Sequence, residues 1–229
     1  MRTVCAPKQI IILVLTMAVI TVAKLNKILT ECGFSEVKSD VSSVVVKQIN
    51  EMTNNRKEAA MFVAQLIHES GGFQHREECN EGAGQPYVPY YGRGYIQLTW
   101  DYNYKAASKF FFEGDERVLL EKPNLLSASP EMSMRVSVWF WEKYVREKAG
   151  SFNDFHATTK VINGGLEPDP EHPKAKKRYE YYQKAAKVLE TPDNDHNYLL
   201  YAAGLTAAAV CVGAVVCACP PVLGCLCLL

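Results

Sequence analysis

The last 31 residues of the chain, 199–229, contain no charged side chain and consist largely of Leu, Ala, Val, Gly and Cys. An uncharged run of this length can span a bilayer, whereas a buried helix without a polar face needs protein on every side, which a small domain rarely supplies. We therefore expect this tail to associate with a membrane, either as a span or as a signal for a lipid anchor. Residues 191–198 form a polar linker before it.

The N-terminus also differs from the middle of the chain. Residues 9–23 are uncharged and lie between Lys8 and Lys24. This run is short for a membrane span and has the proportions of the apolar region of a signal peptide. We predict a cleaved signal over residues 1–23, with an uncleaved anchor as the alternative, and hence an extracellular or cell-surface protein.

The remaining residues, 24–190, are enough for one domain with one sizeable core. The formal net charge is zero and the basic residues are scattered, which argues against a nucleic-acid partner and favours a neutral polymer. No Cys or His spacing resembles a zinc site, so we predict no metal. We also expect a monomer without a cofactor.

Only two of the eight cysteines, Cys32 and Cys79, lie in this domain. In an oxidising compartment they are a candidate disulfide, with two unrelated buried thiols as the alternative.

Apolar residues recur at helical spacing through most of the domain. The pattern predicts two short helices within residues 24–55 and a helix over 58–69 that ends at Gly71 and Gly72. Further helices are expected around residues 104–112, 132–146, 157–161 and 175–189. Residues 80–89 read as an irregular loop and 95–98 as a short extended piece. The predicted fold class is mainly α.

Glu69 continues the apolar face that Phe62 and Leu66 define on its predicted helix. Burial would raise the pKa of its carboxyl group, which a general acid working near neutral pH requires. Glu77 and Glu78 follow shortly afterwards, and glycoside cleavage commonly uses one protonated and one ionised carboxyl. The alternative for Glu69 is a side chain that frays into solvent at the helix end. The alternative for the paired carboxylates is an ordinary acidic pair on the surface.

Residues 90–104 are rich in aromatic rings and neutral amides. Aromatic surfaces match the apolar faces of sugar rings, and Gln, Asn and Thr match their hydroxyl edges. This composition favours a saccharide cleft, with half-buried tyrosine packing as the alternative.

Three ordered blocks resemble the signatures of plant-type (family 19) chitinases: HESGGF at 68–73, YGRGYIQLT at 91–99 and INGGLE at 162–167. The segment VWFW at 138–141 also resembles that family, and the likeness covers about residues 24–189. The resemblance implies a mainly α, two-lobed lysozyme-like domain with a cleft for β-1,4-linked N-acetylglucosamine.

The resemblance also implies roles for individual residues. Glu69 matches the family's general acid, and Glu78 matches the general base that holds water on the opposite face of the sugar, which leads to inversion. Thr99 matches the position that orients this water. The substrate-binding positions are matched by His68, Gln97, Trp100, Tyr102, Asn103 and Asn163.

Glu167 and Arg178 resemble a family pair that lies beside the acid. A negative Glu167 would raise the pKa of Glu69, and Arg178 would moderate that effect. A surface salt bridge is the alternative reading of these two residues.

The sequence departs from the plant enzymes in a shorter loop before residue 91 and in Tyr95, which replaces a usual proline. We expect an endo-acting inverting chitinase. The alternatives are a peptidoglycan hydrolase of the same fold and a non-catalytic chitin-binding protein.

Overall fold

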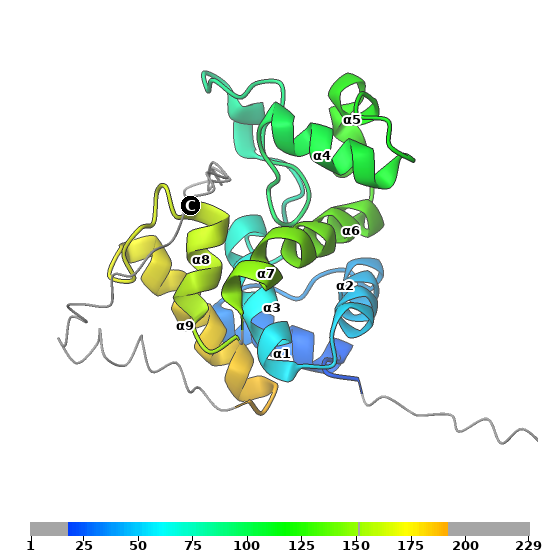
Figure 1. The fold of residues 1–229 in the computed structure, drawn as a ribbon. Helices are drawn as coiled ribbons and strands as arrows, with labels where there is room; N and C mark the ends of the chain where they lie inside the picture. Colours follow the sequence, from blue (N-terminus) through cyan, green and yellow to red (C-terminus); the bar gives the residue numbers. More distant parts are fainter. Residues whose placement is uncertain (1–17, 151, 192–229) are drawn as a thin grey trace, which may run out of the picture.

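The computed structural model describes residues 18–150 and 152–191, and the part that it describes is mainly helical (Figure 1). In chain order the helices are α1 (Val22–Cys32), α2 (Ser39–Met52), α3 (Arg56–Ser70), η1 (Cys79–Gly82), α4 (Asp101–Phe111), α5 (Val118–Glu121), η2 (Pro123–Leu126), α6 (Pro130–Phe140), η3 (Trp141–Val145), α7 (Arg146–Ala149), α8 (Phe155–Asn163) and α9 (Pro173–Val188). The β pairing in the described residues consists of two isolated antiparallel bridges, Glu77 to Arg93 and Arg93 to Leu98. The predicted mainly α class is confirmed.

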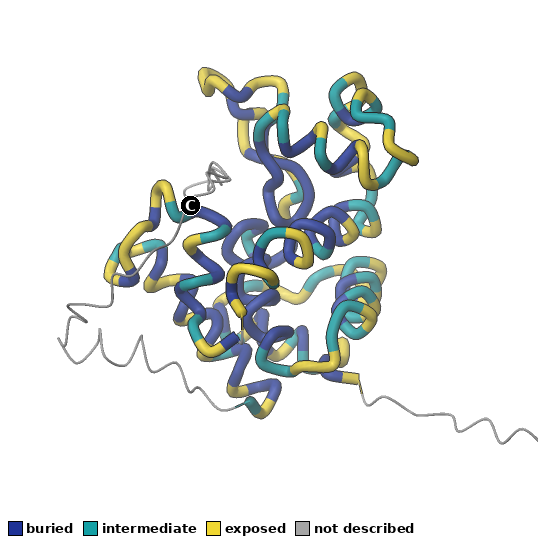
Figure 2. Tube along the Cα trace, in the orientation of Figure 1, coloured by how far each residue is buried: buried dark blue, intermediate teal, exposed yellow. Residues whose placement is uncertain are grey.

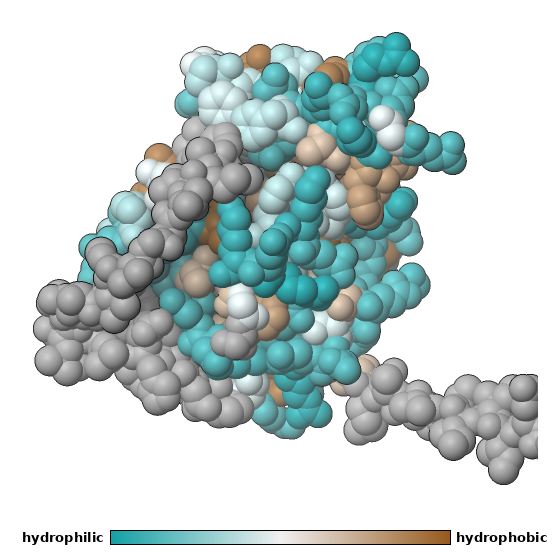
Figure 3. All heavy atoms as spheres, in the orientation of Figure 1, coloured by the Kyte–Doolittle hydropathy of each residue, from teal (hydrophilic) through white to brown (hydrophobic). Residues whose placement is uncertain are grey.

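The helices divide into two parts (Figure 1). α4 and α5 form the upper part together with the loop that follows α3, and α1, α2, α3, α8 and α9 form the lower part. α6 lies between them and packs on both α2 and η2. The face seen in Figure 3 is mostly hydrophilic, with small apolar patches.

α3 is the centre of the lower part. Every residue from Glu58 to Ser70 is buried, and the helix packs against α8 and α9 (Figure 2). The Asn55 side chain caps its first turn by accepting from the backbone N–H groups of Lys57 and Glu58. Gly71 ends it in the left-handed conformation at φ 58°, as the two glycines predicted. A helix covered on all sides positions its last side chains rigidly.

The folded part begins earlier than the predicted limit at residue 24. Val19 and Ile20 are buried, and their backbone N–H groups donate to Asn50 Oδ1 at 2.8 and 3.2 Å. Thr21 caps α1, accepting from the backbone of Lys24. A cut after Ala23 would therefore remove core residues and a helix cap. The other residues of the predicted signal, 1–17, lie outside the described part.

The tail predicted to associate with a membrane, 199–229, also lies outside the described residues, as do residues 192–198 of the linker. Across residues 18–150 and 152–191, no helix combines the length and the apolar character that crossing a bilayer requires.

The candidate disulfide between Cys32 and Cys79 is not formed. Cys32 is a free, buried thiol at the end of α1, and burial raises its pKa to about 11. The alternative of two buried thiols is correct for Cys32 and wrong for Cys79, which is exposed.

Residues 95–98 were expected to be extended, and this prediction is wrong. They form a tight turn that is closed by two backbone hydrogen bonds between Arg93 and Leu98, at 3.1 and 2.8 Å. Gln97 lies at φ 55° inside this turn. The short helices α5 and η2 were not predicted, because four residues are too few to show a helical period.

Candidate active site

Glu69 lies in the last turn of α3 with a fully buried side chain. Its Oε1 is 2.6 Å from Arg178 Nη1, which comes from α9. Burial raises the pKa of Glu69, Arg178 opposes this, and the negative charge of Glu167 adds to the rise, so that the net pKa lies above its usual value. The predicted burial of Glu69 and the predicted rise of its pKa are confirmed, and the alternative of a frayed, exposed Glu69 is wrong.

Glu167 and Arg178 form a buried pair rather than the surface salt bridge considered above. Arg178 Nε and Nη2 donate to the two oxygens of Glu167 at 2.9 and 3.0 Å, and Asn163 Nδ2 donates to Oε1 at 2.6 Å. Burial would raise the pKa of Glu167, but these bonds and the arginine charge outweigh it and lower the pKa. Glu167 is therefore held as a carboxylate close to Glu69.

His68 precedes the acid on α3 and is also buried. Burial and the positive charge of Arg178 lower its pKa well below the usual value, so the imidazole is neutral at neutral pH. Its ring centroid lies 6.2 Å from that of Tyr181. A neutral ring adds no positive charge beside Glu69.

Glu78 is held in the loop after α3, at a different place from the acid cluster. Its side chain accepts from Tyr87 Oη at 2.7 Å and from the backbone N–H of Gly92 at 2.9 Å, and it is buried. The neighbouring Glu77 is exposed and accepts from the Ser127 hydroxyl. The structure thus separates two adjacent carboxylates: Glu78 points inward and Glu77 outward.

The turn at residues 93–98 and the start of α4 bring Gln97, Thr99 and Asn103 together. Gln97 Nε2 donates to the carbonyl of Gly94 at 2.9 Å, and Thr99 Oγ1 donates to the carbonyl of Gln97 at 2.9 Å. Asn103 Nδ2, in the first turn of α4, donates to the carbonyl of Thr99 at 2.8 Å. All three side chains are buried.

Trp100 and Tyr102 extend this group with aromatic surface. The Trp100 ring lies 5.4 Å from that of Tyr87, edge to face, and 6.2 Å from that of Tyr102, nearly parallel. Tyr87 also donates to Glu78, so this tyrosine connects the aromatic group to the predicted base.

The predicted site residues therefore fall into two clusters. The acid cluster contains Glu69 of α3, Asn163 of α8, Glu167 of the loop between α8 and α9, and Arg178 of α9, with His68 beside it. The base cluster lies in residues 78–103 and contains Glu78, Gln97, Thr99, Trp100, Tyr102 and Asn103. In Figure 1 the first belongs to the lower part of the molecule and the second to the upper part.

Sequence reasoning missed Arg93, which holds the base cluster in shape. This buried guanidinium donates to the carbonyl of Pro89 at 3.0 Å, to Tyr104 Oη at 2.8 Å and to Asn124 Oδ1 at 2.8 Å. It also lies 3.5 Å above the ring of Tyr91. Its place between two glycines in an aromatic segment was the available signal. Gln65, also missed, contacts Arg178.

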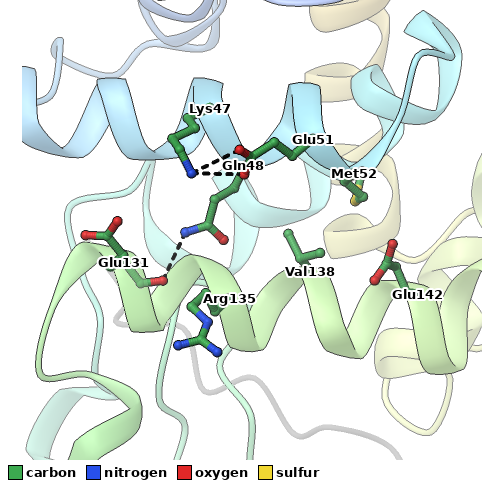
Figure 4. A pocket seen from close by; sticks show the side chains of 8 residues that line it. All are labelled: Lys47, Gln48, Glu51, Met52, Glu131, Arg135, Val138 and Glu142. Atoms are coloured by element: carbon green, nitrogen blue, oxygen red, sulfur yellow. Dashed lines mark hydrogen bonds and ion pairs between the residues drawn. The ribbon is translucent and has the colours of Figure 1, made fainter. Parts of the chain in front are cut away.

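A groove between α2 and α6, with a volume of about 360 Å³, lies apart from both clusters (Figure 4). Lys47 pairs with Glu51 at 3.0 Å, and Gln48 Nε2 donates to the carbonyl of Glu131 at 3.1 Å. No aromatic ring lines it, so it lacks the surface that stacks on sugars. Within the described residues, His, Cys, Asp and Glu side chains form no group of three that could hold a metal ion.

Known proteins are similar to this chain in sequence. The family model described as "Chitinase class I" matches residues 74–153. Endochitinase At2g43610 of Arabidopsis thaliana is 35% identical over 164 residues, which cover 65% of this chain and 56% of the relative. The acidic endochitinase of Dioscorea japonica is 32% identical over 182 residues, covering 72% of this chain and 70% of the relative. The chain spans about half the length of the Arabidopsis endochitinases At2g43610 and At2g43620.

Solved structures share the fold. Chitinase C of Streptomyces griseus HUT6037 superposes with a TM-score of 0.61 at 24% identity, covering 77% of this chain and 78% of that one. The class IV chitinase of Zea mays superposes with a TM-score of 0.57 at 24% identity, covering 77% and 97%. The predicted two-lobed, lysozyme-like fold is confirmed, and the chain belongs to glycoside hydrolase family 19, the plant-type chitinases.

Proposed function

We propose that this protein is an endo-acting, inverting chitinase that hydrolyses β-1,4 linkages between N-acetylglucosamine units. The observation that carries the proposal is Glu69: a fully buried carboxyl with a raised pKa, beside a buried arginine–carboxylate pair. A raised pKa favours the protonated form of the carboxyl, which a general acid must hold before it can donate its proton. The endochitinases among the relatives support the same substrate.

In this mechanism Glu69 donates its proton to the glycosidic oxygen while the bond from that oxygen to the anomeric carbon breaks. Glu78 accepts a proton from a water molecule that attacks the anomeric carbon from the opposite face. The hydrogen bonds from Tyr87 and Gly92 hold the Glu78 carboxylate in one orientation. Thr99 assists by orienting the water, and the aromatic rings of the base cluster stack on the sugars.

The test is product analysis by NMR after the full chain is incubated with chitin hexamer. We expect the α-anomer to appear first, because attack opposite a β-linkage inverts the anomeric carbon. Glu69→Gln and Glu78→Gln should each lower kcat by roughly a thousandfold. Glu77→Gln is the matched control, because its exposed side chain neighbours Glu78 and should not affect turnover.

Three outcomes would count against the proposal. Full activity of Glu69→Gln would exclude it as the acid, and an early β-anomer would exclude inversion. Preferential cleavage of purified peptidoglycan over chitin would reassign the substrate.

The proposed location rests on the composition of the two ends. We infer passage through the secretory pathway and membrane association through residues 199–229, which carry no charge. Fractionation of cells that produce the full chain, compared with a chain ending at residue 198, tests this; equal recovery of both in the aqueous fraction would exclude a membrane role for the tail.

A further inference from the structure

Gln65 is a fully buried amide one helical turn before Glu69 on α3. A buried amide is costly unless its polar atoms are hydrogen-bonded. Gln65 Oε1 accepts from Arg178 Nη1 at 2.9 Å, and Gln65 Nε2 donates to the hydroxyls of Thr158 and Thr159 on α8, both at 2.9 Å. One side chain thus connects the three helices that carry the acid cluster.

The hydrogen-bond network determines which way the Gln65 amide faces. Thr158 Oγ1 donates its only proton to the carbonyl of Phe155 at 2.7 Å, so toward Gln65 it can only accept. The Gln65 nitrogen must therefore face α8, and its oxygen must face Arg178. The opposite orientation would point N–H groups at a guanidinium, which has no acceptor.

Arg178 uses different nitrogens for its different partners. Nε and Nη2 are occupied by Glu167, while Nη1 contacts both Gln65 and Glu69. Nη1 carries two hydrogens, so one serves Gln65 and the other points to Glu69. Because Glu167 and Gln65 hold the plane of the guanidinium, the remaining hydrogen of Nη1 is directed at Glu69.

We propose that Gln65 is a positioning residue that orients Arg178, so that Nη1 reaches Glu69 while Nε and Nη2 hold Glu167. The significance of this arrangement for catalysis rests on the proposed role of Glu69 as general acid. Gln65 acts through Arg178 rather than through contact with substrate.

The charged groups that act on Glu69 are Arg178 and Lys174 of α9 and Glu167 of the loop between α8 and α9. Gln65 adds no charge to this set. Gln65→Glu would place a third carboxylate on Arg178 and withdraw the arginine from Glu69. Gln65→Met keeps the length of the side chain but removes the acceptor, so Nη1 is no longer directed at Glu69. Both changes weaken the favourable interaction with the charged form of Glu69, so its pKa rises.

The experiment compares the full chain with Gln65→Glu and Gln65→Met. The Glu69 carboxyl is titrated by ¹³C NMR, and kcat and KM on chitin hexamer are measured against pH. We expect the titration midpoint and the high-pH limb of kcat/KM to move upward by roughly one pH unit in Gln65→Glu and less in Gln65→Met. We expect kcat of Gln65→Met to fall by roughly tenfold with KM nearly unchanged.

Glu58→Gln is the matched control. Glu58 lies buried on the same helix but bonds Trp141 Nε1 at 2.9 Å and Arg146 Nε at 2.7 Å, away from the acid cluster. Glu58→Gln should lower the stability of the fold and leave the titration midpoint of Glu69 unchanged. An equal shift in this control, or an unchanged midpoint in both Gln65 variants, would overturn the proposal. If Gln65→Glu does not fold, the midpoint in Gln65→Met decides.

The titration needs no substrate. An inactive wild-type protein whose Glu69 midpoint still responds to Gln65 would therefore reject the proposed chitinase activity while retaining the positioning role of Gln65.

Discussion

Glu69 and Glu167 are two buried carboxyls that share one arginine, yet their pKa values shift in opposite directions. Burial is the largest influence on both and raises both. Glu167 receives two hydrogen bonds from the arginine and one from an amide, which together reverse the effect of burial, whereas Glu69 is contacted by one nitrogen of Arg178. The unequal sharing of Arg178 favours the protonated form of Glu69 and the negatively charged form of Glu167.

Glu167→Gln should lower the pKa of Glu69, because it removes a negative charge that raises this pKa. A general acid is active only while protonated, so activity is lost as pH rises through its pKa. The high-pH limb of kcat/KM should therefore move to lower pH, by roughly one unit. Glu171→Gln is the control, because Glu171 pairs with Lys176 in half-exposed surroundings. A limb that stays in place, or that moves upward, would contradict this account.

The end of α3 depends on a close approach between two elements. Gly72 follows the helix at φ 70°, and a Cβ there would lie 2.6 Å from the Phe34 ring. Phe34 follows α1 and packs against Tyr181 of α9, with ring centroids 5.7 Å apart. The glycine therefore lets the turn after Glu69 pack directly on Phe34, at the contact between the end of α1 and α9.

Gly72→Ala should destabilise the fold by about 3 kcal/mol, the sum of left-handed backbone strain and overpacking against Phe34. Gly33→Ala separates the two contributions. Gly33 is also left-handed, at φ 89°, but a Cβ there meets no atom within 4 Å, so strain alone should cost about 1 kcal/mol. Urea unfolding of both variants measures the difference. Equal losses would show that contact with Phe34 does not matter.

For the whole molecule, the lower part depends on residues that precede the predicted domain limit. Val19 and Ile20 belong to the same core cluster as α3, and the Asn50 side chain of α2 binds the backbone of both. The segment before α1 is thus one wall of the core that surrounds α3 and, through it, supports Glu69.

A chain that begins at Lys24 should be less stable than one that begins at Ala18. Each lost apolar side chain costs about 2 kcal/mol and the lost Thr21 cap about 1 kcal/mol. For a domain of this size the sum corresponds to a melting temperature lower by roughly 10 °C or more. Thermal unfolding followed by circular dichroism measures it. Equal melting temperatures would mean that Val19 and Ile20 contribute little to the core.

The sequence by itself determined the mainly α class, the positions of the long helices, the end of α3 at its glycines and the burial of Glu69. These features depend on apolar periodicity and on backbone preferences, which act between residues a few positions apart. The three motif blocks added the resemblance to the family, and the spacing after the first block added the prediction that Glu78 is the general base.

The tertiary structure alone decided the rest. The orientation of Arg178 depends on Gln65, 113 positions away in the chain. The free Cys32, the inward Glu78 beside the outward Glu77, and the burial of Val19 are also set by contacts between distant segments. No local pattern encodes such contacts, because each depends on how separate helices pack and on which buried polar groups must then be paired.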